Sequence, residues 1–433
     1  MLSKREVVRE LRIALLGAGT VGGGLIELIQ NRAQALQART GTEIKITAVA
    51  DRSHRKKAFL QNQSFDVSDD AISVIERDDV DVVVELIGGL EPAREWVLHA
   101  LKKGKHVVTA NKALLANHGK EIFAQAAEVG REIGFEAAVA GALPVVRNLR
   151  RVWVGSDMHE MFGILNGTCN FIITRMQKED MAYEDALKIA QEKGFAEADP
   201  AFDVSGRDAA QKLAILSTLA FDHLVQESDI RVEGITELSP LDHAMAMRMG
   251  KVIRLLAVAK KKSDGYHLRV HPALISSKHL LASVEEENNA LFTDDPYSGP
   301  TMIVGRGAGA FPTASAVLSD IAAIARNPEG QPEIWVSGSQ SMQCASDASY
   351  RFYLRFRTLD RAGVLAAISK VLADHEISIA TMHQEEGPEP VDVVIVTHGA
   401  RESKLASALD IINAMEIIRA PTVALRLEEP GQG

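Results

Sequence analysis

Short apolar runs alternate with helical periodicity through the first third of the chain. Runs rich in Val, Ile and Leu are typical of buried strands, and apolar residues three and four apart are typical of helices. Alternation of the two predicts βαβ units and therefore a parallel sheet. The expected strands are residues 12–16, 44–50, 80–86, 106–109 and 133–137, and residues 92–103 form a helix between them.

The pattern changes after Pro144. Helices are expected at 183–193 and 208–221, and strands near 267–270 and 301–304, which indicates an α+β domain. Residues 312–326 are again helical and rich in small side chains, so we expect them to pack back against the first domain. Residues 327–349 are rich in Gly, Ser, Gln and Pro and predict a linker.

Beyond the linker, apolar and charged residues alternate from Tyr350 to Arg357 as in a strand with one buried face. A turn at 360–363 opens a helix, and the remaining pattern completes a βαββαβ unit. Its later elements are expected at 377–382, 391–397, 405–414 and 422–427.

The bulk composition excludes several classes of protein. A net charge of -10 argues against a nucleic-acid partner, which needs a concentrated basic surface. The chain has no apolar window of about 18 residues and no apolar signal segment at its start, so we expect no membrane span and a cytoplasmic location. Its two cysteines, Cys169 and Cys344, lie far apart, which suits a reducing compartment.

A glycine-rich loop follows the first expected strand and precedes a helical pattern. This context gives the GxGxxG spacing its meaning: the glycines allow a tight turn, a close approach to a pyrophosphate and close helix packing. We therefore predict a Rossmann-type dinucleotide site. Its loop residues are Gly17, Ala18, Gly19, Thr20, Val21 and Gly22.

The end of the second strand leaves the choice of cofactor open. Asp51 suits a ribose 2′-hydroxyl and favours NAD, whereas Arg52 suits a 2′-phosphate and favours NADP. Lys112 follows the fourth strand at the edge of the sheet where ligands bind, so we expect it beside the nicotinamide or the substrate. A surface lysine is the alternative interpretation.

Residues 190–212 concentrate polar chemistry, with Glu197, Asp208 and Lys212 as the candidates for substrate binding and proton transfer. Asp208 and Lys212 share a helix face, so an exposed ion pair would also explain them. The segment reads AxxxGFAExDPxxDVxGxDxxxK in one-letter code and resembles the signature of the homoserine dehydrogenases. The resemblance covers roughly residues 11–326.

That resemblance implies the interconversion of L-aspartate 4-semialdehyde and L-homoserine with NADP or NAD, in threonine, isoleucine and methionine biosynthesis. It implies that Lys212 donates the proton to the carbonyl oxygen, with Lys112 near the nicotinamide. It also implies substrate contacts from Glu197 and Asp208. Gly194 and Gly307 match positions beside the cofactor.

The family resemblance also implies a monovalent cation, with Na⁺ expected, held mainly by main-chain oxygens. The matching positions are Glu136, Val139, Gly141 and Leu143. The alternative is that this loop of small residues simply packs under the sheet.

Residues 359–365, LDRAGVL in one-letter code, resemble the start of an ACT domain, a module that often binds amino acids. L-Threonine is the expected effector, and an assembly role without ligand is the alternative. A homodimer or homotetramer is expected from the same resemblance.

We therefore expect an α/β chain with a Rossmann-type parallel sheet, an α+β substrate and dimerisation domain, and a C-terminal βαββαβ ACT domain. The expected bounds are 1–142 with 310–326, 143–309, a linker at 327–349, and 350–428. Two other functions remain open: another NAD(P)-dependent reductase of a semialdehyde or imine, and a catalytically silent amino-acid sensor.

Overall fold

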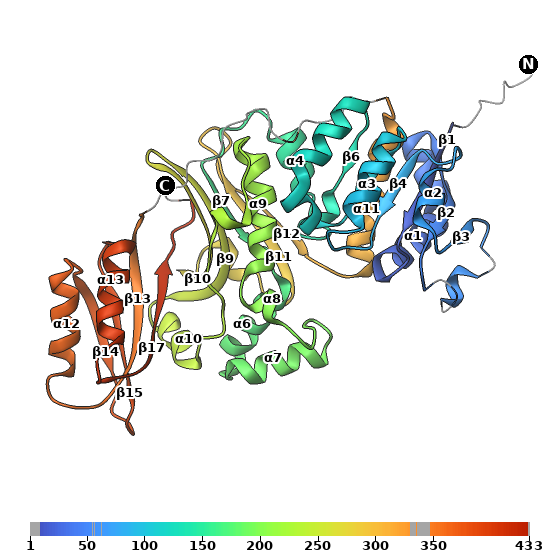
Figure 1. Cartoon of the computed structure of the whole chain (residues 1–433). Helices are drawn as coiled ribbons and strands as arrows, with labels where there is room; N and C mark the ends of the chain where they lie inside the picture. The colour runs from blue at the N-terminus through green and yellow to red at the C-terminus, as the bar shows by residue number, and fades with distance from the viewer. Residues whose placement is uncertain are drawn as a thin grey trace, which may run out of the picture.

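Three lobes lie in a row in the computed structural model of the chain (Figure 1). The structure describes residues 9–53, 55, 57–61, 63–329, 335 and 347–431. The blue N-terminal lobe and the red C-terminal lobe lie at opposite ends, and the middle of the chain lies between them. Cys344 and most of the predicted linker fall outside the described residues.

The first lobe is built on a parallel sheet with the strand order β3-β2-β1-β4-β5-β6. Because the chain starts near the middle and winds outward in both directions, this order confirms the predicted Rossmann-type sheet. Among the described residues its strands are β1 (Arg9–Leu16), β2 (Thr42–Ala50), β3 (Asp66–Ser68), β4 (Val82–Glu85), β5 (His106–Thr109) and β6 (Ile133–Gly134).

Side chains along β1 alternate between the two covered faces of this sheet. Ile13 and Leu15 pack against α1 (Thr20–Thr40) and α11 (Ala310–Arg326). Ala14 and Leu16 join the core on the opposite face. The helices on that opposite face are α2 (Ala71–Ile75), α3 (Ala93–Lys102) and α4 (Lys112–Val129).

Helix α11 returns from the middle lobe to the first sheet, as its small residues predicted. A Cβ added at Gly24 of α1 would lie 3.2 Å from the Ala310 carbonyl oxygen and 3.5 Å from the Ala314 Cβ. The two helices therefore touch backbone to backbone. Figure 1 shows α11 beside the helices of the first lobe.

Strand β6 is shorter than predicted, because it ends at Gly134 instead of continuing to residue 137. The chain turns there into a short 3-10 helix, Glu136–Ala138. The Glu136 N–H donates to Asp320 Oδ2 of α11 over 2.8 Å, so this backbone group bonds to a helix and not to a neighbouring strand. A long-range contact of this kind leaves no periodic signal in the local sequence.

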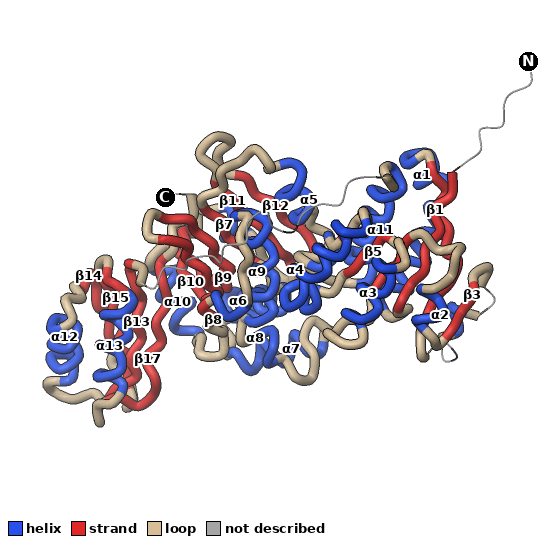
Figure 2. Tube along the Cα trace, turned by 45° about the horizontal axis from the view of Figure 1, so that its top comes forward, coloured by secondary structure: helices blue, strands red, loops and turns tan. Residues whose placement is uncertain are grey.

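The middle lobe is an α+β arrangement around β7 (Glu160–Ile164), β9 (Lys251–Lys262), β10 (Gly265–Ser276), β11 (Asn288–Asp294) and β12 (Thr301–Arg306). Its strands run in the order β12-β11-β7-β9-β10. Figure 2 shows the helices gathered on one side of these strands. The lobe also contains α5 (Val145–Arg147), α6 (Gly167–Glu179), α7 (Tyr183–Glu192), α8 (Ala201–Val204), α9 (Arg207–Phe221), α10 (Pro240–Arg248) and the short β8 (Arg231–Val232).

The C-terminal lobe has the predicted βαββαβ order and its own apolar core. Its elements are β13 (Ser349–Thr358), α12 (Val364–Asp374), β14 (Ile379–Gln384), β15 (Val391–Thr397), β16 (Ala400–Arg401), α13 (Glu402–Asn413) and β17 (Ile418–Leu427). Strand β15 has the predicted bounds, and α13 begins three residues before the expected helix.

Strand β17 pairs in parallel with β10, so the C-terminal sheet continues the sheet of the middle lobe. Buried ion pairs reinforce this joint. The carboxylate of Glu402 accepts hydrogen bonds from Arg269 of β10 and Arg426 of β17. Asp242 of α10 accepts from the Tyr353 hydroxyl over 2.8 Å and from Arg355 over 2.8 Å.

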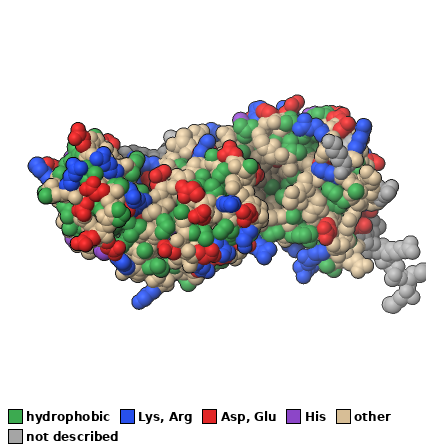
Figure 3. Space-filling model, turned by 90° about the horizontal axis from the view of Figure 1, so that it is seen from below, with side chains coloured by type: hydrophobic (Ala, Val, Ile, Leu, Met, Phe, Trp, Pro, Cys, Tyr) green, Lys and Arg blue, Asp and Glu red, His purple; other side chains and the backbone are tan. Residues whose placement is uncertain are grey.

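The surface in Figure 3 carries acidic and basic side chains interspersed over the same face. This distribution agrees with the net charge of -10 and offers no broad basic stripe on that face. Within the described part of the chain, no helix is both long enough and apolar enough to cross a membrane.

Asp242→Asn is expected to loosen the joint between the middle and C-terminal lobes. The fully buried Asp242 carboxylate accepts five hydrogen bonds, and an Asn amide would turn its own N–H donors toward some of these donors. We expect a loss of about 3–5 kcal/mol, seen as a lower midpoint in calorimetric unfolding. Asp374→Asn, at an exposed pair with Lys370, is the matched control and should leave the midpoint unchanged. Equal midpoints for the two variants would contradict the structural role of Asp242.

Candidate active site

A cavity of about 640 Å³ lies between the edge of the first sheet and the middle lobe. Ala110 and Lys112 reach it from the end of β5, where ligands bind in open parallel sheets. The middle lobe contributes the segments at Asn166, Gly194 and Asp208. The remaining wall comes from residues 137–141 and 306–312, which border the two crossings between the lobes.

The glycine-rich loop has the backbone that a phosphate site requires. Gly17 has a φ of +98°, and a Cβ there would lie 2.9 Å from Ile87. A Cβ at Gly22 would lie 2.3 Å from the Gly17 carbonyl oxygen, whereas Gly19 has no heavy atom within 4 Å of such a position. Two glycines thus allow close packing, and the third leaves open space before the N-terminus of α1, which has no side-chain cap.

Asp51 lies at the end of β2 with its carboxylate surrounded by donors. Oδ2 accepts from the Ala18 N–H over 2.9 Å and from Lys57 Nζ over 2.6 Å. Oδ1 accepts from the Ser53 N–H over 2.8 Å and from its hydroxyl over 2.7 Å. Burial alone would raise the pKa of Asp51, but these hydrogen bonds hold it well below its usual range. The neighbouring Arg52 is exposed.

Glu85 shapes the loop that follows β4. Its buried carboxylate accepts from the N–H groups of Ile87 and Gly88, over 2.9 and 3.0 Å, and from the Thr109 hydroxyl over 2.6 Å. The Thr109 hydroxyl in turn accepts from the Asn111 N–H over 3.0 Å. This network ties the ends of two neighbouring strands together beside the cavity.

Asp208 holds three functional side chains together. On α9 it lies one turn before Lys212, whose Nζ donates to Oδ2 over 2.7 Å. Lys112 Nζ lies 3.2 Å from Oδ1, and Asn166 Nδ2 donates to Oδ2 over 2.8 Å. Lys212 Nζ also donates to the Leu165 carbonyl over 2.7 Å. The structure thus brings Asp208, Lys212 and Lys112, three of the predicted site residues, together at one cavity.

Two acids of this cavity, Asp208 and Asp203, have pKa values shifted in opposite directions. Burial would raise the pKa of Asp208, but the charges of Lys212 and Lys112 lower it to about 2. Burial and the charge of Asp208 raise the pKa of Asp203, whose Oδ1 accepts from Asn166 Nδ2 over 2.7 Å. A pair of acids separated in this way is typical of functional sites.

Lys212 is oriented by two fixed acceptors. An ammonium group has three N–H donors, and Asp208 and the Leu165 carbonyl take two of them. The side chain is only 13% exposed, yet it lines the cavity. One donor is therefore left for a ligand in the cavity.

Glu197 is not brought to this cluster. Its side chain is exposed and does not line the cavity, although Gly194 and Phe195, just before it, do. Its main-chain oxygen accepts from Gln191 Nε2 over 3.1 Å. The predicted role of Glu197 in substrate binding stays a prediction.

Gly307 lines the cavity where only a glycine fits, because an added Cβ would lie 2.1 Å from the amide carbon of Asn289. Asn289 Nδ2 donates to the Leu165 carbonyl over 3.0 Å, so this amide supports the same oxygen that orients Lys212. The sequence analysis did not single out Asn289, Asn166 or Asp203 as site residues. Asp203 lies within the segment 190–212 that resembles the family signature, which was a signal for it, whereas Asn166 and Asn289 lie outside that segment.

The four positions expected to hold a cation lie on one turn between β6 and α5. Glu136 is buried, and its carboxylate accepts from the N–H groups of Val146 and Arg147 over 2.8 and 2.9 Å. Ala140 and Gly141 both have a φ of +55°, which reverses the chain beside the cavity. No cluster of three or more His, Cys, Asp or Glu placed to hold a metal occurs in the described part of the chain.

Family models match most of the chain. The model described as the NAD-binding domain of homoserine dehydrogenase matches residues 17–136, and the model described as homoserine dehydrogenase matches residues 144–322. An ACT domain model matches residues 352–416.

Curated relatives and solved structures give the same result. Homoserine dehydrogenase of Neisseria gonorrhoeae is 39% identical over 432 residues, covering 97% of this chain and 99% of the relative. The Corynebacterium glutamicum enzyme is 41% identical over 426 residues, covering 96% and 95%. A crystal structure from Thiobacillus denitrificans has a TM-score of 0.90 at 39% identity, covering 97% and 99%. A hyperthermophilic archaeal homoserine dehydrogenase in complex with NADPH has a TM-score of 0.63 at 26% identity, covering 74% and 99%.

Glu136 is expected to make stability depend on pH. Burial and the nearby Asp320 raise the pKa of Glu136 from 4.5 to about 7. Because the folded-state pKa is the higher one, the stabilising effect is complete below pH 4.5 and is lost as the pH rises to about 7. Relative to Glu136→Gln, the wild type should lose at most about 3 kcal/mol over that range, measured by thermal unfolding at each pH. The control, Glu128→Gln on the surface of α4, should run parallel to the wild type. A parallel curve for Glu136→Gln would refute the prediction.

Proposed function

The chain belongs to the homoserine dehydrogenase family, and from this premise we propose that Lys212 is its proton donor. The protein is an NAD(P)-dependent oxidoreductase that interconverts L-aspartate 4-semialdehyde and L-homoserine in amino-acid biosynthesis. The observation that carries the assignment is the orientation of Lys212, with two donors held by protein acceptors and one left for the cavity.

The chemistry of the aldehyde requires such a group. When bound, a reduced nicotinamide would supply the hydride for the aldehyde carbon, and negative charge would then develop on the carbonyl oxygen. Lys212 stabilises this charge and gives its proton to the oxygen, which becomes the hydroxyl of homoserine. In the reverse direction the neutral amine accepts the proton.

Asp208 positions this lysine and sets the charge of the cavity. Its low pKa keeps it anionic at neutral pH, so its negative charge offsets the charge of the adjacent lysines. We assign Asp203, which lines the same cavity, to the ammonium group of the substrate together with Asp208. Glu197 would join them only if residues 194–199 turned toward the cavity.

We propose NADPH as the preferred cofactor. The acceptor oxygens of Asp51 already receive four donors, which leaves them poorly suited to a ribose hydroxyl. Lys57 offsets the negative charge of Asp51, and the exposed Arg52 follows directly. A 2′-phosphate would find two cations here instead of an unpaired carboxylate. The NADPH complex of the archaeal relative is consistent with this choice.

A monovalent cation is proposed on the turn of Glu136, Val139, Gly141 and Leu143. The positive φ values at 140 and 141 turn the chain sharply here, and main-chain oxygens are among the ligands that hard cations take. The Leu143 carbonyl also accepts from the Val145 N–H over 2.8 Å, so it would have to serve both partners. When bound, the ion would support the wall of the cavity at Gly141.

The C-terminal ACT domain suggests an amino-acid effector, and we propose L-threonine as that effector.

We also propose that the chain is divided into three domains. Their bounds are residues 1–142 with 310–326, residues 143–309 and residues 350–428. Strand β14 ends the long strand path, and an uncovered edge strand can pair with another copy. We therefore infer a homodimer or homotetramer.

Lys212→Ala is expected to lower turnover by about 100-fold or more, because general acid catalysis contributes on that scale. The assay follows NADPH absorbance with L-aspartate 4-semialdehyde, and NADPH affinity should stay close to that of the wild type. Lys188→Ala, an exposed lysine on α7, is the matched control with unchanged turnover. Full activity in Lys212→Ala would remove the lysine from the mechanism.

Arg52→Ala is expected to raise the KM for NADPH by about 10-fold or more while leaving the KM for NADH nearly unchanged, because only NADPH carries the 2′-phosphate. Steady-state kinetics with each cofactor measure the two effects. Arg32→Ala, on the exposed side of α1, serves as the control. Equal effects on both cofactors would argue against a phosphate contact.

A further inference from the structure

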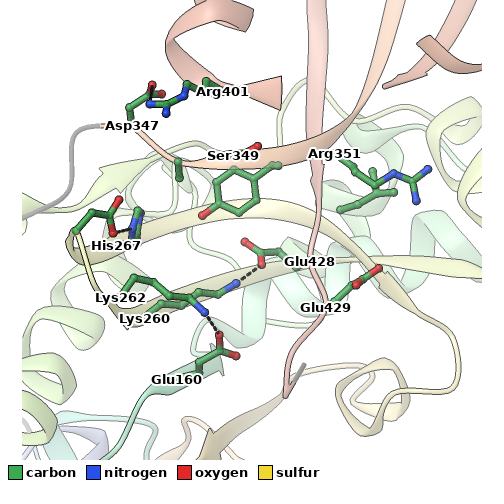
Figure 4. A pocket seen from close by; sticks show the side chains of 14 residues that line it. Glu160, Lys260, Lys262, His267, Asp347, Ser349, Arg351, Arg401, Glu428 and Glu429 are labelled. Atoms are coloured by element: carbon green, nitrogen blue, oxygen red, sulfur yellow. Dashed lines mark hydrogen bonds and ion pairs between the residues drawn. The ribbon is translucent and has the colours of Figure 1, made fainter. Parts of the chain in front are cut away.

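We propose that a small zwitterion, an α-amino acid, binds in a second cavity at the joint between the middle lobe and the ACT domain. This cavity has a volume of about 550 Å³, within the range of about 300–1,000 Å³ typical of small-molecule sites. Figure 4 shows it bounded by β9 and β10 on one side and by β13 and the end of β17 on the other. The inference rests on the proposed effector function and gives it a location.

The cavity contains charges of both signs that are held in place. Lys260 Nζ lies 2.7 Å from Glu428 Oε2, and Lys262 Nζ donates to Glu160 Oε1 over 3.2 Å (Figure 4). Burial would raise the pKa of Glu428, but His271 and Lys260 lower it to about 2. Fixed positive and negative groups within one cavity suit a ligand that carries both an ammonium and a carboxylate.

Three buried side-chain atoms of the lining residues lack a hydrogen-bond partner among the described residues. They are Oε2 of Glu160, a residue that is 3% exposed, Nδ1 of His267, a residue that is 6% exposed, and Oε1 of Glu428, which lies 3.4 Å from His271 Nε2. Buried polar groups are nearly always paired, so an unpaired carboxylate oxygen indicates a missing donor. We assign the ligand ammonium to Glu160 and its carboxylate to Lys262, with the Tyr350 hydroxyl beside them.

Strand β7 connects this cavity to the catalytic cluster. Glu160 is its first residue, and Leu165, whose carbonyl orients Lys212, directly follows its last. The two positions are about 17 Å apart along an extended chain. Glu160 also pairs across the sheet with Lys260 of β9, so β7 adjoins the β9 wall of this cavity. A ligand that binds one arrangement of β7 more tightly would change the orientation of Lys212.

The test is calorimetric titration of the full chain with L-threonine, L-isoleucine and L-methionine separately. We expect the wild type to bind at least one of them. Lys262→Met should weaken that binding by about 10-fold or more, as expected for a lost charged hydrogen bond, and Tyr350→Phe by a smaller factor. Arg361→Ala, at an exposed position of the turn before α12 in the ACT domain, is the control and should bind nearly as the wild type does.

Several outcomes of this titration would contradict the proposal. Wild-type affinity in Lys262→Met, or a loss in Arg361→Ala at least as large as in Lys262→Met, would overturn the amino-acid site in this second cavity. Absence of binding to the wild type at millimolar ligand would do the same. Turnover without amino acid is measured for every variant, because unchanged turnover keeps the catalytic proposal intact whatever the titration shows. In the variant that loses binding, any inhibition by the same amino acid should be lost in parallel.

Discussion

A single buried carboxylate organises the catalytic part of this molecule. Asp208 contacts Lys212 from its own helix, Lys112 from the end of β5 and Asn166 from the start of α6. Burying an anion is costly unless its charge is offset, so the lysines and the carboxylate require one another. Because Lys112 belongs to the first lobe, the same interaction joins the cofactor-binding sheet to the substrate side of the cavity.

The two sheets contribute in different ways. The first is parallel and doubly covered, so its strand ends and loops are free for a dinucleotide at one edge. The second is mixed and extends through β10 and β17 into the ACT domain. Strand β7 lies inside this second sheet and leads to the carbonyl that orients Lys212. Paired strands therefore connect the ACT joint to the carbonyl that orients Lys212.

The local sequence was enough to predict those elements whose signals lie within a short stretch of the chain. The glycine loop, β5, β15 and the placement of Lys212 one turn after Asp208 follow from spacing alone. Features set by distant partners could not be predicted from local sequence. For example, β6 ends early because the Glu136 N–H donates to Asp320 of α11. The parallel pairing of β17 with β10 and the contact of Asn289 with Leu165 join residues more than 100 positions apart. Glu197 lies within a specific motif, yet its side chain faces solvent, because a motif fixes residue types and not loop orientation.

The central claim is that the Lys212 ammonium gives its proton to the substrate oxygen from inside the cavity. Its most direct test is chemical rescue of the Lys212→Ala enzyme by small primary amines, which fit the space left by the side chain. The account predicts that ethylammonium restores turnover in a saturable manner and that the rescued rate varies with the pKa of the added amine. No rescue by any small amine, in an enzyme that still binds NADPH, would contradict it.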